Sequence, residues 1–409
     1  MSGYGDCGFI PLLFASDINV YSVARAFHEQ YGLRSRVYGK ALSGPCANSR
    51  ILDYTSVRDA DRQEVLLALV NDFARAHSDR KILLIGCGDG YVRSISANKG
   101  AYAENVIVPY IDLALLDVLT HKERFYALCR EKGIDYPDTA VHRAGMGRDY
   151  ALPFDGPFII KPSNGVMYWE HPFTGQDKVF KAATRGETDG ILDRIYASGY
   201  DDSVIIQNFI PGDDSFMRVL TGYSDRNGRV RLSCMGHVLL EEHTPHGIGN
   251  HAVILTEYNE TVQAQFAKLL EDLRYTGFSN FDLKYDRRDG KLKVFELNAR
   301  QGRSNYYVTG AGENIARYLV EDFICERDLQ PKFVTARSLW MVVPRRVAFS
   351  FTPRTPYHAE MKRLIRAGRC ANPLLYKADS GLNHRLGVRK NLLGHFFKFA
   401  KYYGKGYEK

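Results

Sequence analysis

The first 115 residues alternate between short runs of consecutive apolar residues and stretches in which apolar residues recur every three or four positions. FIPLLF at 9–14 and KILLIG at 81–86 are continuous apolar runs, which are typical of strands buried on both faces of a parallel sheet. NVIVPYID at 105–112 predicts a third strand. These runs indicate a sheet whose strands are separated by helices.

Two amphipathic helices are predicted between these strands. Ser16-Asp17 supplies a cap for the first helix and Gly32 ends it, and its apolar positions are Val20, Val23, Ala24 and Phe27. The second helix covers 61–76, where apolar residues again fall on one stripe. Alternating strands and helices predict a Rossmann-like parallel α/β domain over about residues 1–115.

The pattern changes after this domain. Residues 113–131 predict one helix, and residues 261–274 predict another with an apolar stripe that packs on the core. Asn227-Gly228 marks the turn of a hairpin. We find neither an internal repeat nor a low-complexity linker. The remaining chain therefore predicts a mixed α+β architecture.

A second hairpin carries the strongest chemical signal. Its turn is Arg288-Asp289-Gly290, and Asp282 and Glu296 lie on the two flanking strands. If the loop has three residues with glycine in the left-handed conformation, the two carboxylates face each other. Facing carboxylates repel unless a cation lies between them. Alternatively, the acidic side chains are only solvated on an exposed face.

Three more polar residues lie on the same strand faces as these carboxylates. The carboxamide of Asn298 adds a third hard oxygen ligand, and Lys284 and Arg300 add positive charge beside it. Oxygen ligands of this kind suit magnesium, which keeps water and nucleotide phosphates in its coordination shell. The hairpin therefore predicts a phosphoryl-transfer site.

The segment FDLKYDRRDGKLKVFELNARQGRSN resembles the metal- and phosphate-binding end of the ATP-grasp superfamily. That resemblance implies ATP held between two α+β subdomains and an acyl-phosphate made from a carboxylate. It implies that Asp282, Glu296 and Asn298 bind Mg²⁺, with Mn²⁺ able to substitute, and that Arg300 contacts phosphate. We expect Lys284 to be catalytic with Arg300 by offsetting the charge on the phosphates. Ala299 stands where the family usually has proline.

Other segments match the superfamily in the expected order. Lys122 stands where a basic residue often reaches the phosphates, although a helix-surface lysine is the simpler alternative. FIIKPSNGVMYW places Lys161 on a strand before a small-residue loop, which suits phosphate binding. The resemblance implies ATP contacts from that loop and from the segment that holds adenine and ribose, namely Ser163, Asn164, Gln207, Asn208, Phe209, Ile210, and Asp213 or Asp214.

Within the superfamily, the chain resembles carbamoyl-phosphate synthase large chains and, from residue 9 to about 320, the D-aspartate ligases of bacterial cell-wall synthesis. The latter resemblance implies a ligase that activates the β-carboxylate of D-aspartate. The amine would be the Lys or Orn side chain of an anionic peptidoglycan precursor, UDP-linked or lipid-linked. Arg303, Ser304, Asp17 and Asn19 are the expected substrate-binding residues.

Three other functions remain open at this stage. The first is an ATP-grasp ligase for another acid. The second is an S-adenosylmethionine-dependent methyltransferase, because the glycine-rich turn IGCGDGY with Gly86, Gly88 and Gly90 follows an apolar strand. The third is a non-catalytic nucleotide-binding module. His243, His246 and His251 suggest zinc, but their glycine-rich spacing favours a substrate-facing loop.

Composition and charge narrow the class of protein. Among 409 residues, 45% are hydrophobic and 25% charged, as in ordinary globular proteins. The seven cysteines are scattered without a disulfide or zinc pattern, and no secretory signal or membrane-spanning run is apparent. These features predict a cytoplasmic protein with two or three domains. We expect an ATP-grasp domain over 116–330, with a lid subdomain at about 140–210.

The charge is concentrated near the C-terminus. Residues 331–409 contain 17 Lys and Arg against three Asp and Glu, a net +14, so the whole-chain charge of +8 leaves 8 − 14 = −6 for residues 1–330. This basic C-terminal region suggests an anionic partner other than nucleic acid. Its last stretch predicts either an amphipathic helix on an anionic membrane surface or a helix packed on its own domain.

Overall fold

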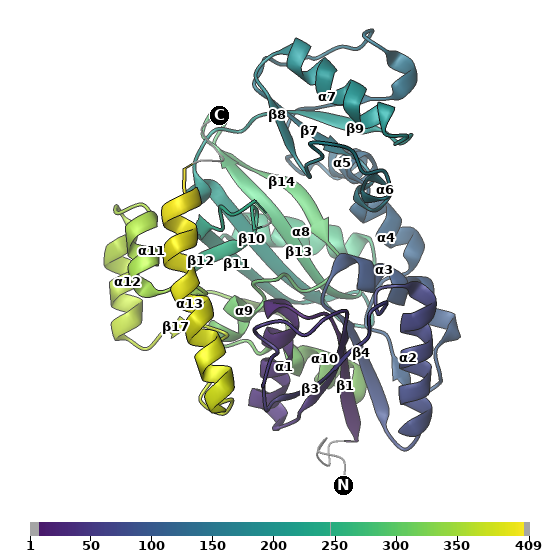
Figure 1. Cartoon of the computed structure of the whole chain (residues 1–409), viewed down its shortest axis with the longest axis vertical. Helices are drawn as coiled ribbons and strands as arrows, with labels where there is room; N and C mark the ends of the chain where they lie inside the picture. The colour runs from purple at the N-terminus through teal and green to yellow at the C-terminus, as the bar shows by residue number, and fades with distance from the viewer. Residues whose placement is uncertain (1–7, 246, 405–409) are drawn as a thin grey trace. The chain divides into compact units, whose positions relative to one another are not determined.

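A computed structural model describes residues 8–245 and 247–404 of the chain. The chain forms two compact units, which we describe separately (Figure 1). The first unit contains Met1–Leu113, Asp213–Asn280 and Asn298–Lys409, and the second contains Ala114–Gly212 and Phe281–Leu297. The backbone therefore enters and leaves the second unit twice.

A parallel five-stranded sheet in the order β3-β2-β1-β4-β5 lies in the first unit. Its central strands are the apolar runs singled out in the sequence, and every residue of β1 is buried. The strands are β1 (Phe9–Phe14), β2 (Ser35–Gly39), β3 (Leu52–Ser56), β4 (Lys81–Gly86) and β5 (Val106–Ile107). The predicted parallel α/β architecture is confirmed. The run at 105–112 forms a much shorter strand than expected.

Helices α1 (Ile18–Tyr31), α2 (Gln63–Ala76) and α3 (Asp89–Ala97) connect these strands. Asp17 caps α1 as predicted, because its Oδ1 accepts a hydrogen bond from the Asn19 amide at 3.0 Å. Gly32 ends the helix in the left-handed conformation, with φ of 67°. Both signals were correctly predicted from the sequence.

The larger sheet follows the order β14-β13-β10-β11-β12-β16-β17, with β15 pairing β11. The hairpin predicted at Asn227-Gly228 joins β10 to β11, and Gly228 has φ of 75°. The helix predicted at 261–274 is α8 (Glu260–Asp272). The strands are β10 (Met217–Ser224), β11 (Val230–Glu241), β12 (His251–Glu257), β13 (Gly277–Asp286), β14 (Lys291–Asn298), β15 (Lys332–Phe333), β16 (Leu339–Met341) and β17 (Cys370–Ala371).

The second unit has a sheet of its own in the order β6-β9-β7-β8. Its strands are β6 (Thr139–His142), β7 (Phe158–Pro162), β8 (Phe180–Ala182) and β9 (Val204–Asn208), and its helices are α4 (Leu113–Thr120), α5 (Lys122–Glu131), α6 (Gly165–Glu170) and α7 (Arg185–Ala197). The single helix expected over 113–131 is wrong, because His121 is extended between α4 and α5. Its ring accepts from the Arg124 amide and pairs with Asp202.

Two loops in this unit differ from the sequence-based expectation. The small-residue loop after Lys161 is instead the short helix α6, because Asn164 caps it by accepting from the Met167 amide at 3.2 Å. The loop between β13 and β14 has four residues, 287–290, rather than three, although Gly290 is left-handed with φ of 73°. The turn by itself therefore does not set Asp282 opposite Glu296.

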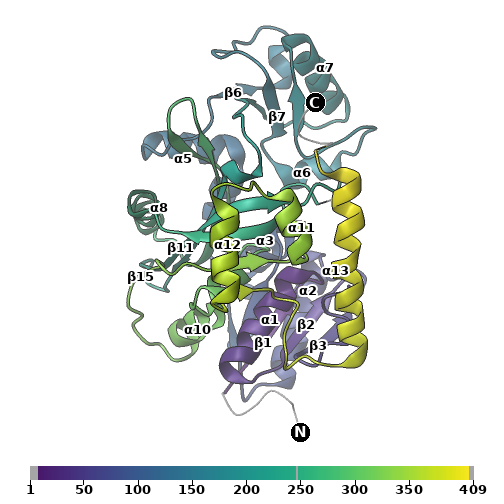
Figure 2. The same cartoon turned by 90° about the vertical axis from the view of Figure 1, so that its left-hand side faces the viewer.

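The basic C-terminal region is part of the first unit. It contains α11 (Arg345–Phe351), α12 (Tyr357–Arg366) and α13 (Leu382–Tyr402), of which α13 is the long yellow helix in Figure 2. Tyr21 and Ser49 both donate to Asp379 just before α13, at 2.9 and 2.7 Å. None of the described helices is both long and apolar enough to cross a lipid bilayer.

Candidate active site

A group of lysines surrounds one carboxylate in the second unit. Lys161 on β7 is half-buried, and burial lowers the pKa of its ammonium to about 8. The ammonium groups of Lys122, Lys178 and Lys284 lower this pKa further, whereas Glu296 raises it. Several cations therefore share one anionic side chain. Such a cluster favours a multiply charged anion such as a polyphosphate.

Hydrogen bonds fix the strand that carries Lys161. The carbonyl of Ser163 accepts from the Lys122 amide at 3.1 Å, which ties the start of α5 to the end of β7. The buried hydroxyl of Ser163 accepts from Ser203 Oγ at 2.8 Å. Both lysines are thus held by the same backbone junction. The predicted residues Lys122, Lys161 and Ser163 therefore lie close together. The hydroxyl of Ser163 is hydrogen-bonded to another residue of the protein.

Strand β14 brings Glu296 to these lysines. The Oε1 atom of Glu296 lies 3.7 Å from Nζ of Lys178, and the ammonium of Lys161 lies 4.8 Å from the ring centre of Phe295. The hydroxyl of Tyr126 on α5 donates to the Phe295 carbonyl. The ring of Phe209 also lies near two lysines, at 4.5 Å from Lys181 and 5.4 Å from Lys284.

The segment expected to hold adenine, 207–210, makes several hydrogen bonds to other residues of the second unit. The buried side chain of Gln207 donates to Thr139 Oγ1 at 2.9 Å, and the amide of Phe209 donates to the Pro157 carbonyl at 3.1 Å. Asn208 donates through its side chain to Asp155 and accepts from Arg288. Ile210 is buried. An open hollow of about 480 Å³ lies beside this segment, lined by Ile134, Asp135, Tyr136, Asp138, Thr139, Pro153 and Phe154.

The three expected metal ligands lie on the two hairpin strands. Asp282 and Glu296 are half-buried residues of the second unit, and Asn298 begins the last stretch of the first unit. The Oδ1 of Asn298 accepts from Nη2 of Arg300 at 3.2 Å. Carboxylate and carboxamide oxygens are ligands of the kind that Mg²⁺ takes.

In the first unit, Arg300 lies at the glycine-rich turn. Its Nε is 2.8 Å from Oδ1 of Asp89, and its Nη2 is 2.9 Å from Oδ2. The next residue, Gln301, donates to the Gly86 carbonyl at 3.3 Å. Gly86 approaches α3 so closely that a Cβ atom would lie 3.0 Å from the Val92 amide nitrogen. The glycine-rich turn thus packs against the arginine segment rather than forming an open nucleotide loop.

Arg303 lies between two carboxylates of the first unit. Its Nε is 3.7 Å from Oδ2 of Asp17, and its Nη2 is 3.7 Å from Oε1 of Glu242. Burial raises the pKa of the Asp17 carboxyl, and the charge of Arg303 opposes that shift. In such a group the guanidinium can pair with the carboxylate of an amino acid, and the two carboxylates can pair with its ammonium. The predicted substrate residues Arg303 and Asp17 therefore lie together.

Ser304 and Asn19 have protein partners. Oγ of Ser304 lies 3.3 Å from Nδ1 of His251, and burial followed by the charge of Arg303 lowers the pKa of that histidine to about 4. His251 is therefore neutral at pH 7. Asn19 is buried, donates to the Cys87 carbonyl at 3.0 Å and accepts from Asn305 at 2.8 Å. In this structure Asn19 positions its neighbours.

The two aspartates expected near ribose differ in burial. Asp213 is exposed and accepts from the Ser215 amide at 2.9 Å. Asp214 is buried and accepts from the Glu241 amide at 2.8 Å, and its Oδ2 lies 2.9 Å from Nε2 of His243. Of the two, Asp213 is the more accessible to a ligand.

The histidine loop shows no zinc site in the described part of the chain. There, no three His, Cys, Asp or Glu side chains gather in a way that could hold a metal ion. His243 pairs with Asp214, whereas His251 lies beside Ser304. His246 lies outside the described residues.

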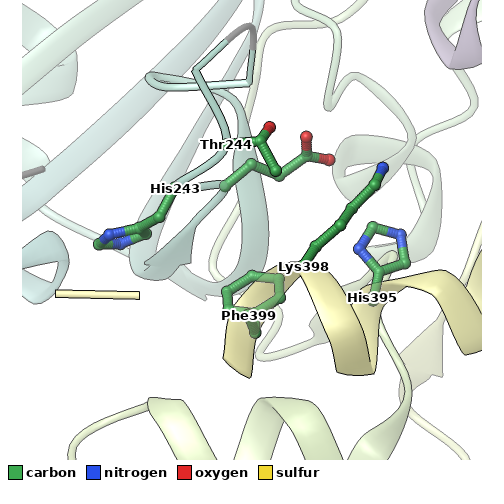
Figure 3. A pocket seen from close by; sticks show the side chains of 6 residues that line it. His243, Thr244, His395, Lys398 and Phe399 are labelled. Carbon is green, nitrogen blue, oxygen red and sulfur yellow. The ribbon is translucent and has the colours of Figure 1, made fainter. Parts of the chain in front are cut away.

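Sequence reasoning missed residues that long-range contacts bring to these groups. Glu242, His395 and Lys398 line a narrow pocket with His243, Thr244 and Phe399, and Figure 3 shows α13 forming one side of it. Burial lowers the pKa of His395 to about 4, and the charges of Lys398 and Arg303 lower it further. For His395 and Lys398, the sequence signal is the basic character of the C-terminus.

Solved structures share this fold. An L-amino acid ligase from Bacillus licheniformis is 14% identical, with a TM-score of 0.53, covering 79% of this chain and 77% of that one. An N5-carboxyaminoimidazole synthetase from Staphylococcus aureus, complexed with ADP, is 12% identical with a TM-score of 0.58, covering 83% and 84%. The biotin carboxylase domain of a Hydrogenobacter thermophilus 2-oxoglutarate carboxylase, in complex with MgADP, is 11% identical with a TM-score of 0.58, covering 80% and 73%. The chain thus has the ATP-grasp fold expected from its sequence.

Similarity along the whole chain identifies the family. No protein-family model matches. A protein named D-aspartate ligase from Enterococcus faecium (strain Aus0004) is 39% identical over 407 residues, covering 97% of each chain. The chain belongs to the D-aspartate ligase family and is a ligase. This finding excludes the methyltransferase alternative as the main activity and confirms the resemblance seen in the sequence.

Proposed function

We propose that the protein joins the β-carboxylate of D-aspartate to the side-chain amine of Lys or Orn in a peptidoglycan precursor, using ATP and Mg²⁺. The full-length similarity to a D-aspartate ligase carries this proposal. The lysines around Lys161 and the charged groups around Arg303 support it, because the reaction needs an anion site for phosphates and a site for an amino acid.

In this proposal, the second unit holds the ATP phosphates. Lys122, Lys161 and Lys284 offset the negative charge that moves during phosphoryl transfer, a reaction that depends mainly on positioning and electrostatics. Asp282, Glu296 and Asn298 would hold Mg²⁺, which would neutralise part of the phosphate charge. The adenine and ribose would lie along 207–210 and Asp213.

The reaction has two steps. A β-carboxylate oxygen attacks the γ-phosphorus, and the bond to the β-phosphate oxygen breaks, which gives β-aspartyl phosphate and ADP. The acceptor amine then attacks the acyl carbon, and phosphate and a proton leave as the amide forms. Arg300 would stabilise phosphate charge, and its contacts with Asp89 hold its guanidinium in place.

The acid would bind at Arg303. Its guanidinium would hold the α-carboxylate of aspartate, while Asp17 or Glu242 would accept hydrogen bonds from the α-ammonium. Ser304, beside the neutral ring of His251, would donate to the same carboxylate. This division of charges suits a zwitterionic amino acid with a second acidic group.

We also propose a cytoplasmic location. The described cysteines, Cys46, Cys87, Cys129, Cys234, Cys325 and Cys370, are all free thiols, as expected in a reducing compartment. ATP and precursors linked to UDP are available there.

The test is ADP release with Mg²⁺ and UDP-N-acetylmuramoyl pentapeptide, comparing D-aspartate, L-aspartate and no acid. We expect turnover only with D-aspartate and a product heavier by one aspartyl residue. Turnover with a different acid would replace D-aspartate while keeping the ligase chemistry. ADP release that does not depend on any acid would contradict the proposed reaction.

A further inference from the structure

Helix α13 has two apolar faces, of which only one is covered. His384, Val388, His395 and Phe399 are buried in the first unit. Leu382, Leu386, Leu393 and Phe397 are 72%, 52%, 61% and 79% exposed. Each exposed residue precedes a buried one by two positions, which is about 200° around an α-helix. The exposed residues therefore form a stripe on the face opposite the buried one, which we call the outer stripe.

Positive charge flanks the outer stripe. Arg385 and Arg389 lie along one side of it, Lys390 and Lys401 lie along the other, and all four are exposed. The helix LNHRLGVRKNLLGHFFKFAKY contains no Asp or Glu. An exposed apolar stripe between cations is the pattern of helices that lie in the interface of an anionic membrane, where long basic side chains reach the headgroups.

The inner face of α13 is firmly attached, so the outer stripe cannot turn inward without breaking contacts. His384 lies 2.9 Å from the Ala47 carbonyl and 3.3 Å from the Tyr21 hydroxyl through its two ring nitrogens. Near the other end, the ring of Phe399 packs against Phe351 at 5.4 Å between centroids. The helix thus packs on its own unit with one face and exposes apolar and basic residues on the other. The sequence left open a helix packed on its own domain or a helix on a membrane surface, and these two alternatives are compatible.

We propose that α13 docks on an anionic lipid surface through the outer stripe, lying parallel to the membrane without crossing it. Leu382, Leu386, Leu393 and Phe397 would enter the headgroup region, and the flanking cations would pair with lipid phosphates. A second copy of the chain fits this face less well, because two helices without acidic residues would bring like charges together.

Docking would place the membrane on the outer face of α13, while the inner face of the same helix lines the pocket beside the candidate substrate groups. His395 and Lys398 of this helix line the pocket with Glu242 and His243 (Figure 3), and the charge of Arg303 contributes to the lowered pKa of His395. A lipid-linked acceptor would then be held on the same membrane surface as the protein. This consequence rests on the proposed function, whereas docking itself does not.

The experiment is co-flotation of the full-length protein with vesicles, without ATP or substrates. Vesicles of phosphatidylcholine alone are compared with vesicles that also contain phosphatidylglycerol. We expect binding only to the anionic vesicles, and weaker binding as salt screens the charges. Leu393→Glu combined with Phe397→Glu should reduce partitioning by roughly tenfold or more. Leu375→Glu is the matched control, because Leu375 is 59% exposed in the same unit but lies outside α13.

A second pair of variants tests the charges. Arg389→Glu with Lys390→Glu should weaken partitioning by roughly fivefold for each cation lost, while Lys332→Glu on β15 should leave it unchanged. If the apolar double variant fails to fold, Leu382→Ser with Leu386→Ser replaces it as a milder change. Folding is checked by circular dichroism.

Three results would overturn the proposal. One is equal binding to neutral and anionic vesicles. Another is unchanged partitioning of the outer-stripe variants. The third is a dimer in solution that Leu393→Glu dissociates while vesicles are not bound, since the stripe would then join two copies of the chain. ADP release is measured separately, so a failed docking test leaves the proposed ligase reaction standing.

Discussion

Arg300 and Asp89 lie 211 positions apart in the sequence and form a two-point ion pair, with Nε to Oδ1 at 2.8 Å and Nη2 to Oδ2 at 2.9 Å. Arg300 belongs to the metal-and-phosphate motif, whereas Asp89 begins the helix after the glycine-rich turn. The pair therefore links the two sequence motifs that suggested different functions. One motif supplies the arginine, and the other orients it.

We expect Arg300→Lys to lower ADP formation by roughly 10²- to 10³-fold, because a lysine cannot make the two-point contact or place its charge similarly. Asp89→Asn should lower ADP formation by less than about tenfold, since the side-chain amide oxygen of asparagine can still accept one hydrogen bond from Arg300. Steady-state kinetics with saturating acid and acceptor measures both.

Arg337→Lys is the matched control for this prediction. Arg337 makes a similar two-point pair with Glu360, at 2.8 Å for each contact, outside the candidate active site. Comparable losses in Arg337→Lys and Arg300→Lys would show that the effect is structural and would remove Arg300 from the phosphate site.

Glu296→Gln should reduce ADP formation by a factor of about 10³ or more, because it removes the charge of a proposed metal ligand and a carboxylate that opposes the cations around Lys161. The free energy of unfolding, measured with urea, should change by no more than about 0.5 kcal/mol, as for a typical surface substitution. Glu260→Gln, at the exposed start of α8, is the control and should keep full activity. Near-normal turnover of Glu296→Gln would refute the metal assignment.

The pH dependence of ATP binding should report on Lys161. Burial lowers the pKa of its ammonium to about 8, so in the nucleotide-free protein the charge is lost as pH rises through that value. ATP affinity should therefore fall above about pH 8. Lys161→Arg should bind ATP with a flatter profile, because arginine stays charged. Titration calorimetry from pH 7 to about 9 measures this, and identical profiles for the two proteins would contradict the assignment.

The lowered pKa of Lys161 also makes the stability of the fold depend on pH. Stability should rise with pH, whereas ATP affinity should fall. The folded pKa of about 8 lies below the ordinary lysine value of 10.5, so between these values the unfolded chain binds more protons than the folded one. The contribution of Lys161 to the free energy of unfolding therefore increases as pH rises through this window. Lys161→Met should be more stable than the parent at pH 7 and lose that advantage near pH 10. If the difference in free energy of unfolding between Lys161→Met and the parent did not change with pH, the lowered pKa of Lys161 would be contradicted.

Asp379→Ala should lower the free energy of unfolding by about 3 kcal/mol, because it leaves buried donors unpaired. The carboxylate accepts from Tyr21 at 2.9 Å, Ser49 at 2.7 Å and the Arg50 amide at 2.8 Å. Urea unfolding measures the change, with the exposed Asp328→Ala as control. A loss below about 0.5 kcal/mol would show that this network does not anchor the segment before α13.

The interactions predicted correctly from the sequence are mostly local. Asp17 and Gly32 delimit α1 because capping and left-handed backbone depend on residues within a few positions. The same limit explains the errors. His121 interrupts the helix expected over 113–131 through contacts that include Asp202, which lies 81 positions further along the chain. Asn164 starts a helix where a string of small residues suggested a loop.

By itself, the sequence determined the fold class, and it predicted an order of nucleotide and metal motifs and the residue types that would carry the chemistry. Those features follow from apolar spacing and from short motifs on single strands. Only the tertiary structure decided which charges meet. It placed Lys178 beside Glu296, Asp89 beside Arg300 and Glu242 beside Arg303, and it covered one face of α13 while leaving the outer stripe exposed. Electrostatic interactions depend on distance through space, and distance along the chain does not determine it.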